Sequence, residues 1–483
     1  MASRQSWLAL ALVLALGGCA VGPDYEEPDI TAPDAWTGAV EKELSQEVPD
    51  LEGWWTVLGD TTLTALIAQA DTSNLDLAAA LARLKEARAG TGVAEGAYWP
   101  SLDAYGSYGR TQISEESVPG NTLGGGPANL WQAGFDATWE IDIFGRNRRT
   151  VQAATAIWQA SVESYRDVLV SLYGEVAANY IAVRTLQARL EYANNNAEAL
   201  AETAQLTHDR YDAGLTSLLD VTRARSNLAA QRATIPILES DLNAAMNRMA
   251  ILMGLPPGAM HARLQEVRPL PEAPTDLLVG LPADLLRRRP DVRQAERELA
   301  AQTARIGVAT ADLYPSFSIR GLLGLESTEW GDLGGDSGTW SLIPGFRWNL
   351  FNGGANRNRI RIEEARAEES LAFYEKTVLG ALEDVENAMV ALNRERIRRD
   401  HLQVAVDASE QSVSLVHTQY ISGLTDFQNY LDAQRSMITQ QDELAVSEGT
   451  VVQNLISLNK ALGGGWSPDR IPEELLVAEE DGQ

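Results

Sequence analysis

The stretch WQAGFDATWEIDI, from Trp131 to Ile143, places apolar side chains at the odd positions and mostly polar ones at the even positions. A period of two is the signature of a β-strand with one apolar and one polar face. Similar alternation occurs at 315–326 and 339–351, and more weakly at 101–111. We therefore predict four strands, at about 101–111, 130–143, 315–326 and 339–351. Pro344 lies inside the last strand, where it costs one ladder hydrogen bond.

These four segments also indicate what surrounds the sheet. A half-buried sheet of a soluble protein is the commoner source of any one such strand, but four of about ten residues, with aromatic residues near their ends, fit a membrane barrel better. Four strands cannot close a barrel, and an open edge is not viable in hydrocarbon. The chain must therefore oligomerise. A dimer, trimer or tetramer would have eight, twelve or sixteen strands, and the strand pattern does not choose among them.

The chain contains the same pattern twice. Gly92-Val93-Ala94 followed by Pro100-Ser101-Leu102 recurs as Gly307-Val308-Ala309 followed by Pro315-Ser316-Phe317. The motif Tyr-x-x-Gly-Leu-Thr occurs at 211–216 and again at 420–425. Two matches in the same order, at nearly the same offset, indicate a duplicated unit. Each unit is predicted to run helix, two strands, very long helix, glycine turn and return helix.

The long helices are predicted by apolar residues spaced three and four apart, from Trp158 to Leu190 and from Val378 to Tyr420. This spacing is typical of coiled-coil seams. Residues 146–210 contain no proline, so the first helix would reach on the order of 95 Å. A bundle with a filled core would show the same spacing, but helices that continue from an open barrel can line a duct. We expect Pro236 to bend the first return helix.

The predicted organisation follows from these elements. Its segments are a signal peptide (1–18), a lipid-anchored N-terminal segment (19–60), a first repeat (61–254), a linker or equatorial segment (255–289), a second repeat (290–463) and a C-terminal tail (464–483).

The first residues predict export and lipidation. Arg4 precedes an apolar run from Trp7 to Leu16, which is too short to span a bilayer and is typical of a cleaved signal peptide. Leu16-Gly17-Gly18-Cys19 resembles a lipobox, in which Cys19 becomes the lipid-modified first residue. The alternative is a signal peptide cut elsewhere, which would leave a free thiol. Cys19 is the only cysteine of the chain, so it has no disulfide partner.

Composition and motifs exclude two other classes of function. The formal net charge is −28, which argues against nucleic acid as a partner because phosphate binding requires clustered lysine and arginine. The sequence contains no HExxH, P-loop or Gly-x-Ser-x-Gly motif. We therefore expect no enzyme activity and no cofactor.

Several further motifs resemble those of one family. They are Gly22-Pro23-Asp24-Tyr25, Trp54-Trp55, Trp139–Gly145, Arg288–Val292, Leu350–Gly354 and Leu431–Arg435. With the lipobox and the paired Tyr-x-x-Gly-Leu-Thr turns, the chain resembles the TolC-like outer-membrane efflux proteins of the OprM/NodT lipoprotein type.

The resemblance implies a fold, a function and partners. The fold would be mainly α with a membrane β-barrel: a homotrimer with one shared twelve-stranded barrel, continued by a long periplasmic α-helical barrel. The function would be a passive outer-membrane exit channel for small molecules such as drugs. Its partners would be a periplasmic adaptor (membrane fusion protein), an inner-membrane pump of RND or ABC type and outer-membrane lipid. A type I protein-secretion duct and a structural coiled-coil envelope lipoprotein remain the alternatives.

The resemblance also implies functional residues at the two glycine turns, which would form the periplasmic tips. The gate residues would be Tyr211, Asp220, Tyr420, Asn429 and Asp432, and the adaptor-contact residues would be Gly214, Leu215, Thr216, Gly423, Leu424 and Thr425. Related proteins often carry Asp at the position of Asn429. Threefold symmetry would bring like carboxylates together and raise at least one pKa. The alternative for Asp220 and Asp432 is an ordinary solvated acid or a helix cap.

His208 and His417 occupy equivalent places, three residues before the two turn tyrosines. A trimer could display six imidazoles there, as a metal or pH sensor. The plainer interpretation is that they are exposed helix positions retained from the duplication.

Overall fold

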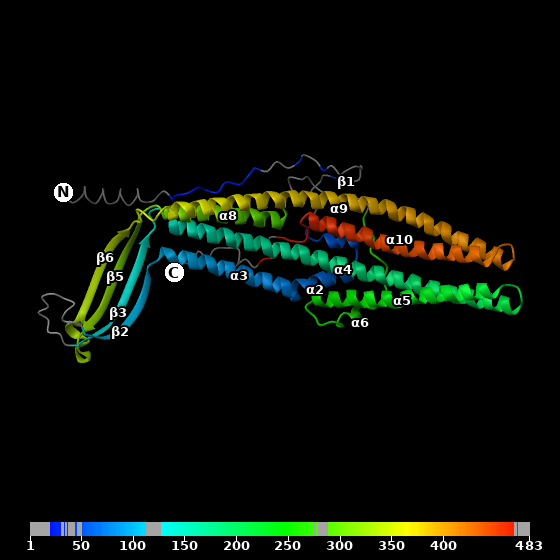
Figure 1. Ribbon diagram of the computed structural model, residues 1–483, viewed down its shortest axis with the longest axis horizontal. Coiled ribbons are helices and arrows are strands. Elements are labelled where there is room, and N and C mark those ends of the chain that lie inside the picture. Colours follow the sequence, from blue (N-terminus) through cyan, green and yellow to red (C-terminus); the bar gives the residue numbers. More distant parts are fainter. Residues whose placement is uncertain are drawn as a thin grey trace. The chain divides into compact units, whose positions relative to one another are not determined.

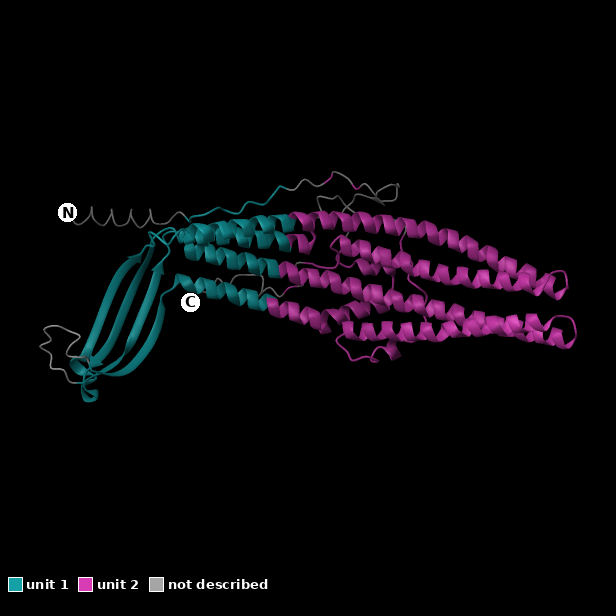
Figure 2. Ribbon diagram, in the orientation of Figure 1, with its two compact units in different colours: residues 1–29, 84–161, 294–374 teal, residues 30–83, 162–293, 375–483 magenta. Residues whose placement is uncertain are grey.

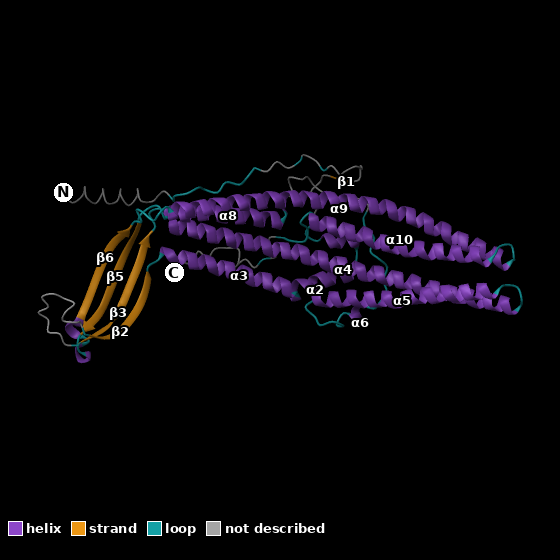
Figure 3. Ribbon diagram, viewed as in Figure 1, coloured by secondary structure: helices purple, strands orange, loops and turns teal. Residues whose placement is uncertain are grey.

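The computed structural model describes residues 20–29, 33, 36, 44–45, 51–112, 127–274, 277–278, 288–467 and 471. Most of these residues are helical, and one four-stranded sheet interrupts the helices (Figure 3). The predicted signal peptide, Cys19 and most of the C-terminal tail lie outside the described residues.

The two repeats contain corresponding elements in the same order (Figure 1). The first comprises α3 (Leu75–Glu95), β2 (Ser101–Thr111), β3 (Ala128–Ile141), α4 (Arg146–Asp212) and α5 (Leu218–Leu252); the second comprises α8 (Pro290–Ala311), β5 (Ser316–Ser327), β6 (Gly338–Arg347), α9 (Ala355–Ile421) and α10 (Phe427–Ala461). Both long helices have 67 residues and both return helices have 35. The structure therefore shows the duplication that the sequence predicts.

Shorter elements accompany the repeats. They are the 3-10 helix η1 (Trp54–Leu58), α2 (Thr61–Ser73), η2 (Gly96–Tyr98), α6 (His261–Leu264), η3 (Trp330–Asp332), η4 (Gly335–Ser337) and a parallel pair of two-residue strands, β1 (Leu44–Ser45) and β4 (Leu277–Leu278).

The strands β2, β3, β5 and β6 form one antiparallel sheet in that order. Most strand bounds lie within two residues of those expected, but β6 ends at Arg347, four residues before the expected end. The chain leaves the sheet there because the indole nitrogen of Trp348 donates to the carbonyl of Leu313 at 3.0 Å, and Gly353 and Gly354 then adopt φ values of +66° and +85° before α9. Pro344 lies in β6 opposite Ile319 of β5, and the strand continues through it to Arg347.

The described chain divides into two compact units, each built from both repeats (Figure 2). Unit 1 consists of 1–29, 84–161 and 294–374 and contains the sheet with the adjoining helix ends. Unit 2 consists of 30–83, 162–293 and 375–483 and contains both helical hairpins. Its core includes Leu169, Tyr173 and Tyr180 of α4 with Leu63 and Leu66 of α2, all fully buried. The helix α5 continues through Pro236.

Candidate functional site

The sheet sorts its side chains onto two chemically different faces. Residues directly opposite on paired strands share a face, and the register puts the large apolar residues together: Trp131, Phe135 and Trp139 of β3, Phe317, Ile319 and Leu323 of β5, and Trp340, Leu342 and Phe346 of β6. Many of these are exposed, Trp340 to 76%. An exposed apolar face of this extent marks an interaction surface.

The other face of the sheet carries most of the charged and polar side chains, together with Leu322 and Ile343. Asp103 of β2 lies opposite Asp136 of β3, and Thr138 of β3 lies opposite Arg320 of β5. Gln132 donates to the Glu326 carboxylate at 3.1 Å across the same two strands. One apolar face and one charged face on the same strands are typical of a barrel that separates lipid from a water-filled interior.

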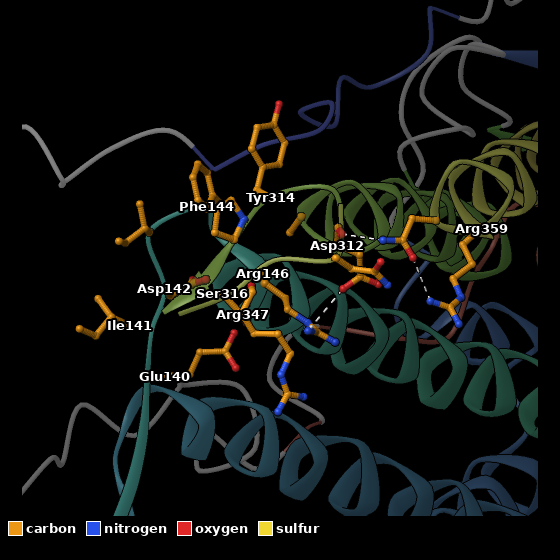
Figure 4. Close-up of a pocket in the computed structure, with 15 residues that line it drawn as sticks. Glu140, Ile141, Asp142, Phe144, Arg146, Asp312, Tyr314, Ser316, Arg347 and Arg359 are labelled. Atoms are coloured by element: carbon orange, nitrogen blue, oxygen red, sulfur yellow. Dashed lines mark hydrogen bonds and ion pairs between the residues drawn. The ribbon is translucent and has the colours of Figure 1, made fainter. Parts of the chain in front are cut away.

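A pocket of about 280 Å³ lies where the strands meet the helices (Figure 4). Arg146 forms an ion pair of 3.4 Å with Asp312, and the Asn356 amide donates to the Asp312 carbonyl at 2.7 Å. The rings of Phe144 and Tyr314 stack at 4.7 Å. These contacts join the starts of α4 and α9 to the end of α8. The pocket holds charged groups but no pairing of a nucleophile with a base.

Both hairpin turns end their long helix in the same way. Gly214 and Gly423 have φ values of +73° and +72°, a conformation that favours glycine. The amide of Leu215 donates to the Arg210 carbonyl at 2.7 Å, and that of Leu424 donates to the Gln419 carbonyl at 2.9 Å. Each glycine amide also bonds the carbonyl of the tyrosine three residues earlier. This is the Schellman pattern, and it fixes the shape of each turn.

The start of each return helix is capped by different residues at equivalent positions. At the first turn, Ser217 is the N-cap and forms a capping box with Asp220. At the second turn, Asp426 is the N-cap and accepts from the Asn429 amide at 3.0 Å, while the Asn429 side chain donates to Thr425 at 2.9 Å. The acidic residue is therefore at the N3 position in the first turn (Asp220) and at the N-cap in the second (Asp426). This accounts for Asn429 at the position that Asp220 occupies in the first repeat.

Asp220 is held by its own turn. Its carboxylate accepts from the Thr216 and Ser217 hydroxyls, each at 2.8 Å. Partial burial alone would raise the pKa of Asp220, but the hydrogen bonds from Ser217 and Thr216 outweigh it, and the pKa is lowered. Within one chain the helix-cap alternative therefore describes Asp220 well, and its role in a gate stays a prediction.

Asp432, by contrast, is exposed on α10. Both of its carboxylate oxygens accept from the Gln428 side chain, at 2.9 and 3.0 Å. This bond lies on the surface of one helix, so the charge remains available to solvent.

The two turn tyrosines lie in different surroundings. Tyr211 is 39% exposed, whereas Tyr420 is 4% exposed. Tyr420 stacks on Tyr430 with ring centroids 5.8 Å apart, within a cluster that includes Phe427. Because its ring packs between helices, Tyr420 belongs to the core of the tips in this chain, and its predicted place at a constriction remains untested.

The predicted adaptor-contact residues lie at the two turns. Leu215 and Leu424 are 66% and 80% exposed. Thr216 and Thr425 are half-buried; the Thr216 hydroxyl donates to Asp220, and the Thr425 hydroxyl accepts from Asn429. Large apolar side chains that stay exposed on a rigid turn are suited to binding a partner.

One residue of the tips escapes prediction from the sequence. Arg210 lies over the ring of Tyr420, 4.9 Å from its centroid, and donates to the Ile421 carbonyl at 3.2 Å. It therefore joins the first hairpin to the second. Comparison of the repeats gives a weak signal, because the residue before the turn tyrosine is Arg210 in the first and Gln419 in the second.

The paired histidines do not form a metal site within the described residues. His208 lies 3.9 Å from Asp212, and the ring of His417 packs 5.2 Å from that of Tyr430. No group of three or more metal-ligating side chains occurs in the part of the chain that the structure describes.

Among the described helices, none has an apolar stretch long enough to cross a membrane.

Known proteins match both repeats. The model of the family described as outer membrane efflux protein matches residues 66–255 and 281–464. Nodulation protein T of Rhizobium leguminosarum bv. trifolii is 31% identical, over 94% of this chain and 96% of its own length. Outer membrane protein OprJ of Pseudomonas aeruginosa is 30% identical, over 96% of each chain. The solved outer-membrane channel OprN superposes with a TM-score of 0.88 at 36% identity, covering 93% of this chain and all of that one.

Proposed function

The chain belongs to the outer membrane efflux protein family, and we propose that three copies form the passive exit duct of a tripartite system that exports small molecules such as drugs. Its function is efflux through an outer-membrane channel. In the proposed trimer, twelve strands form one barrel in the outer membrane, and the helices of the three copies enclose a passage across the periplasm.

The edges of the sheet support a shared barrel. Within the described residues, β2 and β6 each have a strand partner on one side only. Unpaired backbone groups cannot be left in hydrocarbon. Pairing β6 of one copy with β2 of the next removes every edge, and the exposed apolar face then meets lipid. This observation carries the proposal.

An apolar stripe on α9 supports contact between copies along the helices. The stripe consists of exposed side chains separated by seven or eleven residues: Leu379, Val390, Ile397, Val404 and Leu415. Both separations return to nearly the same side of a helix. We propose that a neighbouring copy covers this stripe.

The tips are the proposed meeting point with a periplasmic adaptor, which links the duct to an inner-membrane pump of RND or ABC type. Leu215 and Leu424 supply the exposed apolar contacts, and Gly214 and Gly423 hold them on fixed turns. In a trimer, Asp432 of each copy would face the axis and give the closed entrance a negative potential. Lipid on Cys19 would anchor the mature chain in the outer membrane.

Two substitutions on the edge strand β6 test the barrel. Leu342→Asp puts a charge on the apolar face, and Ser341→Asp puts the same charge on the polar face one residue away. We expect Leu342→Asp to abolish the heat-modifiable oligomer in detergent electrophoresis and Ser341→Asp to leave it intact. A protein that stays folded and monomeric without detergent would overturn the proposal.

The exported compounds are tested in cells. Deleting the gene should raise susceptibility to drugs or solvents at least several-fold, and restoring the gene with Leu342→Asp should not rescue it. If deletion instead stops the release of one secreted protein and leaves susceptibility unchanged, the duct serves type I secretion.

A further inference from the structure

Residues 20–25 lie against α4 and α8 of unit 1 and make specific contacts with both helices. The amide of Val21 donates to the Phe144 carbonyl at 3.1 Å. Arg149, only 3% exposed, donates to the carbonyls of Val21 and Gly22 at 3.1 and 3.2 Å and pairs with Asp24 at 2.9 Å. The N-terminal segment thus supplies three of the four acceptors around this guanidinium, and Gln152 of α4 supplies the fourth, at 3.0 Å.

The fit around Gly22 leaves no room for a side chain. Gly22 has a φ of +90°, and a Cβ there would lie 2.4 Å from the Cα of Gly307 in α8. Gly307 is restricted from the other side, because its own Cβ would lie 2.7 Å from the Arg149 side chain. Two glycines on separate segments therefore allow the N-terminal segment to lie directly on α8 with Arg149 beside it.

Tyr25 fixes the other end of the segment. Its hydroxyl donates to the Glu296 carboxylate at 2.5 Å, and Arg297 lies over its ring at 5.5 Å. The ring packs against three small residues of α4 and α8, namely Ala156, Ala300 and Ala301. A hydrogen bond, a cation–π contact and apolar packing on one side chain make a specific anchor.

Ala20 lies against Gly145, between the end of β3 and the start of α4. A Cβ on Gly145 would lie 2.6 Å from the Cα of Ala20, so the two backbones touch one residue before α4 begins. We infer that Ala20–Tyr25 is a docking peptide whose receptor is formed by Phe144, Arg149, Glu296 and Gly307, and that this docking directs the lipid of the mature chain to the bilayer beside Gly145. The inference rests on the proposed lipidation, and it makes the anchor a fixed part of the sheet's base.

The docking is tested by a matched pair of glycine substitutions. Gly22→Ala adds the colliding Cβ, whereas Gly258→Ala adds a Cβ at the same φ of +90° with no atom closer than 3.8 Å. A spin label is placed on a cysteine at the exposed position Glu26 in the full-length protein in detergent, where lipid blocks Cys19. We expect an immobilised spectrum for the parent and Gly258→Ala, and a mobile one for Gly22→Ala with the oligomer intact. An immobilised spectrum in Gly22→Ala would overturn the docking.

The entry point of the lipid is tested with a photoactivatable fatty acid fed to cells. Cross-links mapped by mass spectrometry should concentrate on peptides around residues 139–148. A four-residue Gly-Ser insertion between Ala20 and Val21 should scatter them, and the same insertion after Asp29 should not. Absence of label on the protein would reject the lipidation, and incorporated label with scattered cross-links in the parent would reject the inference.

Discussion

The two hairpin tips share a backbone but differ in what holds them. Their turns are closed by equivalent hydrogen bonds, and their glycines have almost the same φ. At the second tip, Phe427 and Tyr430 are buried with Tyr420. At the first tip, the residue equivalent to Phe427 is Leu218, which is exposed. The second tip therefore supplies the aromatic rings of a core that both hairpins share, because Ala224 of the first return helix belongs to the same cluster. The first tip adds Arg210, which packs over the ring of Tyr420.

This difference shows which property the duplication retained. Backbone geometry at the turns is common to both copies because glycine and the Schellman bonds fix it locally. The side chains diverged because the two hairpins contribute different parts of one shared core. The second tip supplies its aromatic rings, and the first supplies the smaller buried side chains Val221 and Ala224.

The largest expected effect is on the aromatic core. Tyr430→Ala should destabilise the second tip by about 3–5 kcal/mol, because it removes a buried ring from a packed cluster. The matched change in the first tip, Val221→Ala, removes a smaller buried side chain and should cost about 1–2 kcal/mol. Hydrogen exchange of residues 415–435 measures the first and of residues 206–226 the second. Equal losses of stability from the two substitutions would contradict the larger share of the core that we assign to the second tip.

The link between the tips should be the next largest contribution. Arg210→Ala removes the contact with the Tyr420 ring and the bond to the Ile421 carbonyl, together about 1–2 kcal/mol. We expect roughly tenfold faster amide exchange at the first turn. Arg210→Lys keeps the charge and should lose less. If Arg210→Ala leaves exchange at both turns unchanged, the hairpins are held together by other contacts.

Substitutions of Asp220 and Asp432 test the predicted gate and distinguish an effect of charge from an effect of helix capping. Replacing Asp220 and Asp432 together by Ala should raise single-channel conductance in a planar bilayer by loosening the closed tip. Asp220→Ala alone also loses the Asp220 half of the capping box with Ser217, worth about 1 kcal/mol. Asp220→Asn is the informative control, because it gives the first turn the residue that the second turn carries at Asn429. A conductance increase in Asp220→Asn identifies the charge as the cause, and one seen only in Asp220→Ala identifies the cap. Unchanged conductance and cation preference in the double variant would count against the gate.

The smallest expected effect depends on pH. Because hydrogen bonds lower the pKa of Asp220 in the folded chain, its stabilising effect is complete above the unfolded value of about 3.9 and is lost as the pH falls through the folded-state pKa. Acidification from about pH 5 to pH 3 should therefore cost the first turn from a few tenths to about 1 kcal/mol. Exchange of residues 215–221 measures it, and Asp220→Asn should remove this pH dependence. An unchanged pH profile in Asp220→Asn would assign it to another group.

Much of the fold follows from local sequence patterns. Alternation predicted four strands because one face of each strand is apolar, and the absence of proline from 146–210 predicted one uninterrupted helix; both are confirmed. The predicted end of β6 was wrong by four residues. Trp348 and Leu350 continue the apolar alternation in the sequence, but the Trp348 indole donates to Leu313, which lies outside the sheet.

The candidate site was less predictable because its side chains depend on packing between hairpins about 200 residues apart. Equivalent tyrosines in the two motifs suggested equivalent roles, yet Tyr420 is buried and Tyr211 is half-exposed. Aligning the two repeats in the sequence shows the difference in helix capping. The pair Ser217 and Asp220 in the first repeat corresponds to the pair Asp426 and Asn429 in the second. The position of Arg210 over Tyr420 cannot be found in this way, since nothing local specifies that contact.

Trp139 and Trp348, near the ends of β3 and β6, each bond the backbone that precedes the first strand of their pair. The Trp139 indole donates to the Tyr98 carbonyl at 3.0 Å, and the Trp348 indole donates to the Leu313 carbonyl at 3.0 Å. Each pair of strands is thus attached to the segment before it by an indole bond in addition to the backbone, and to the long helix after it by the backbone. In the proposed trimer, these indole bonds would brace the rim of the shared barrel.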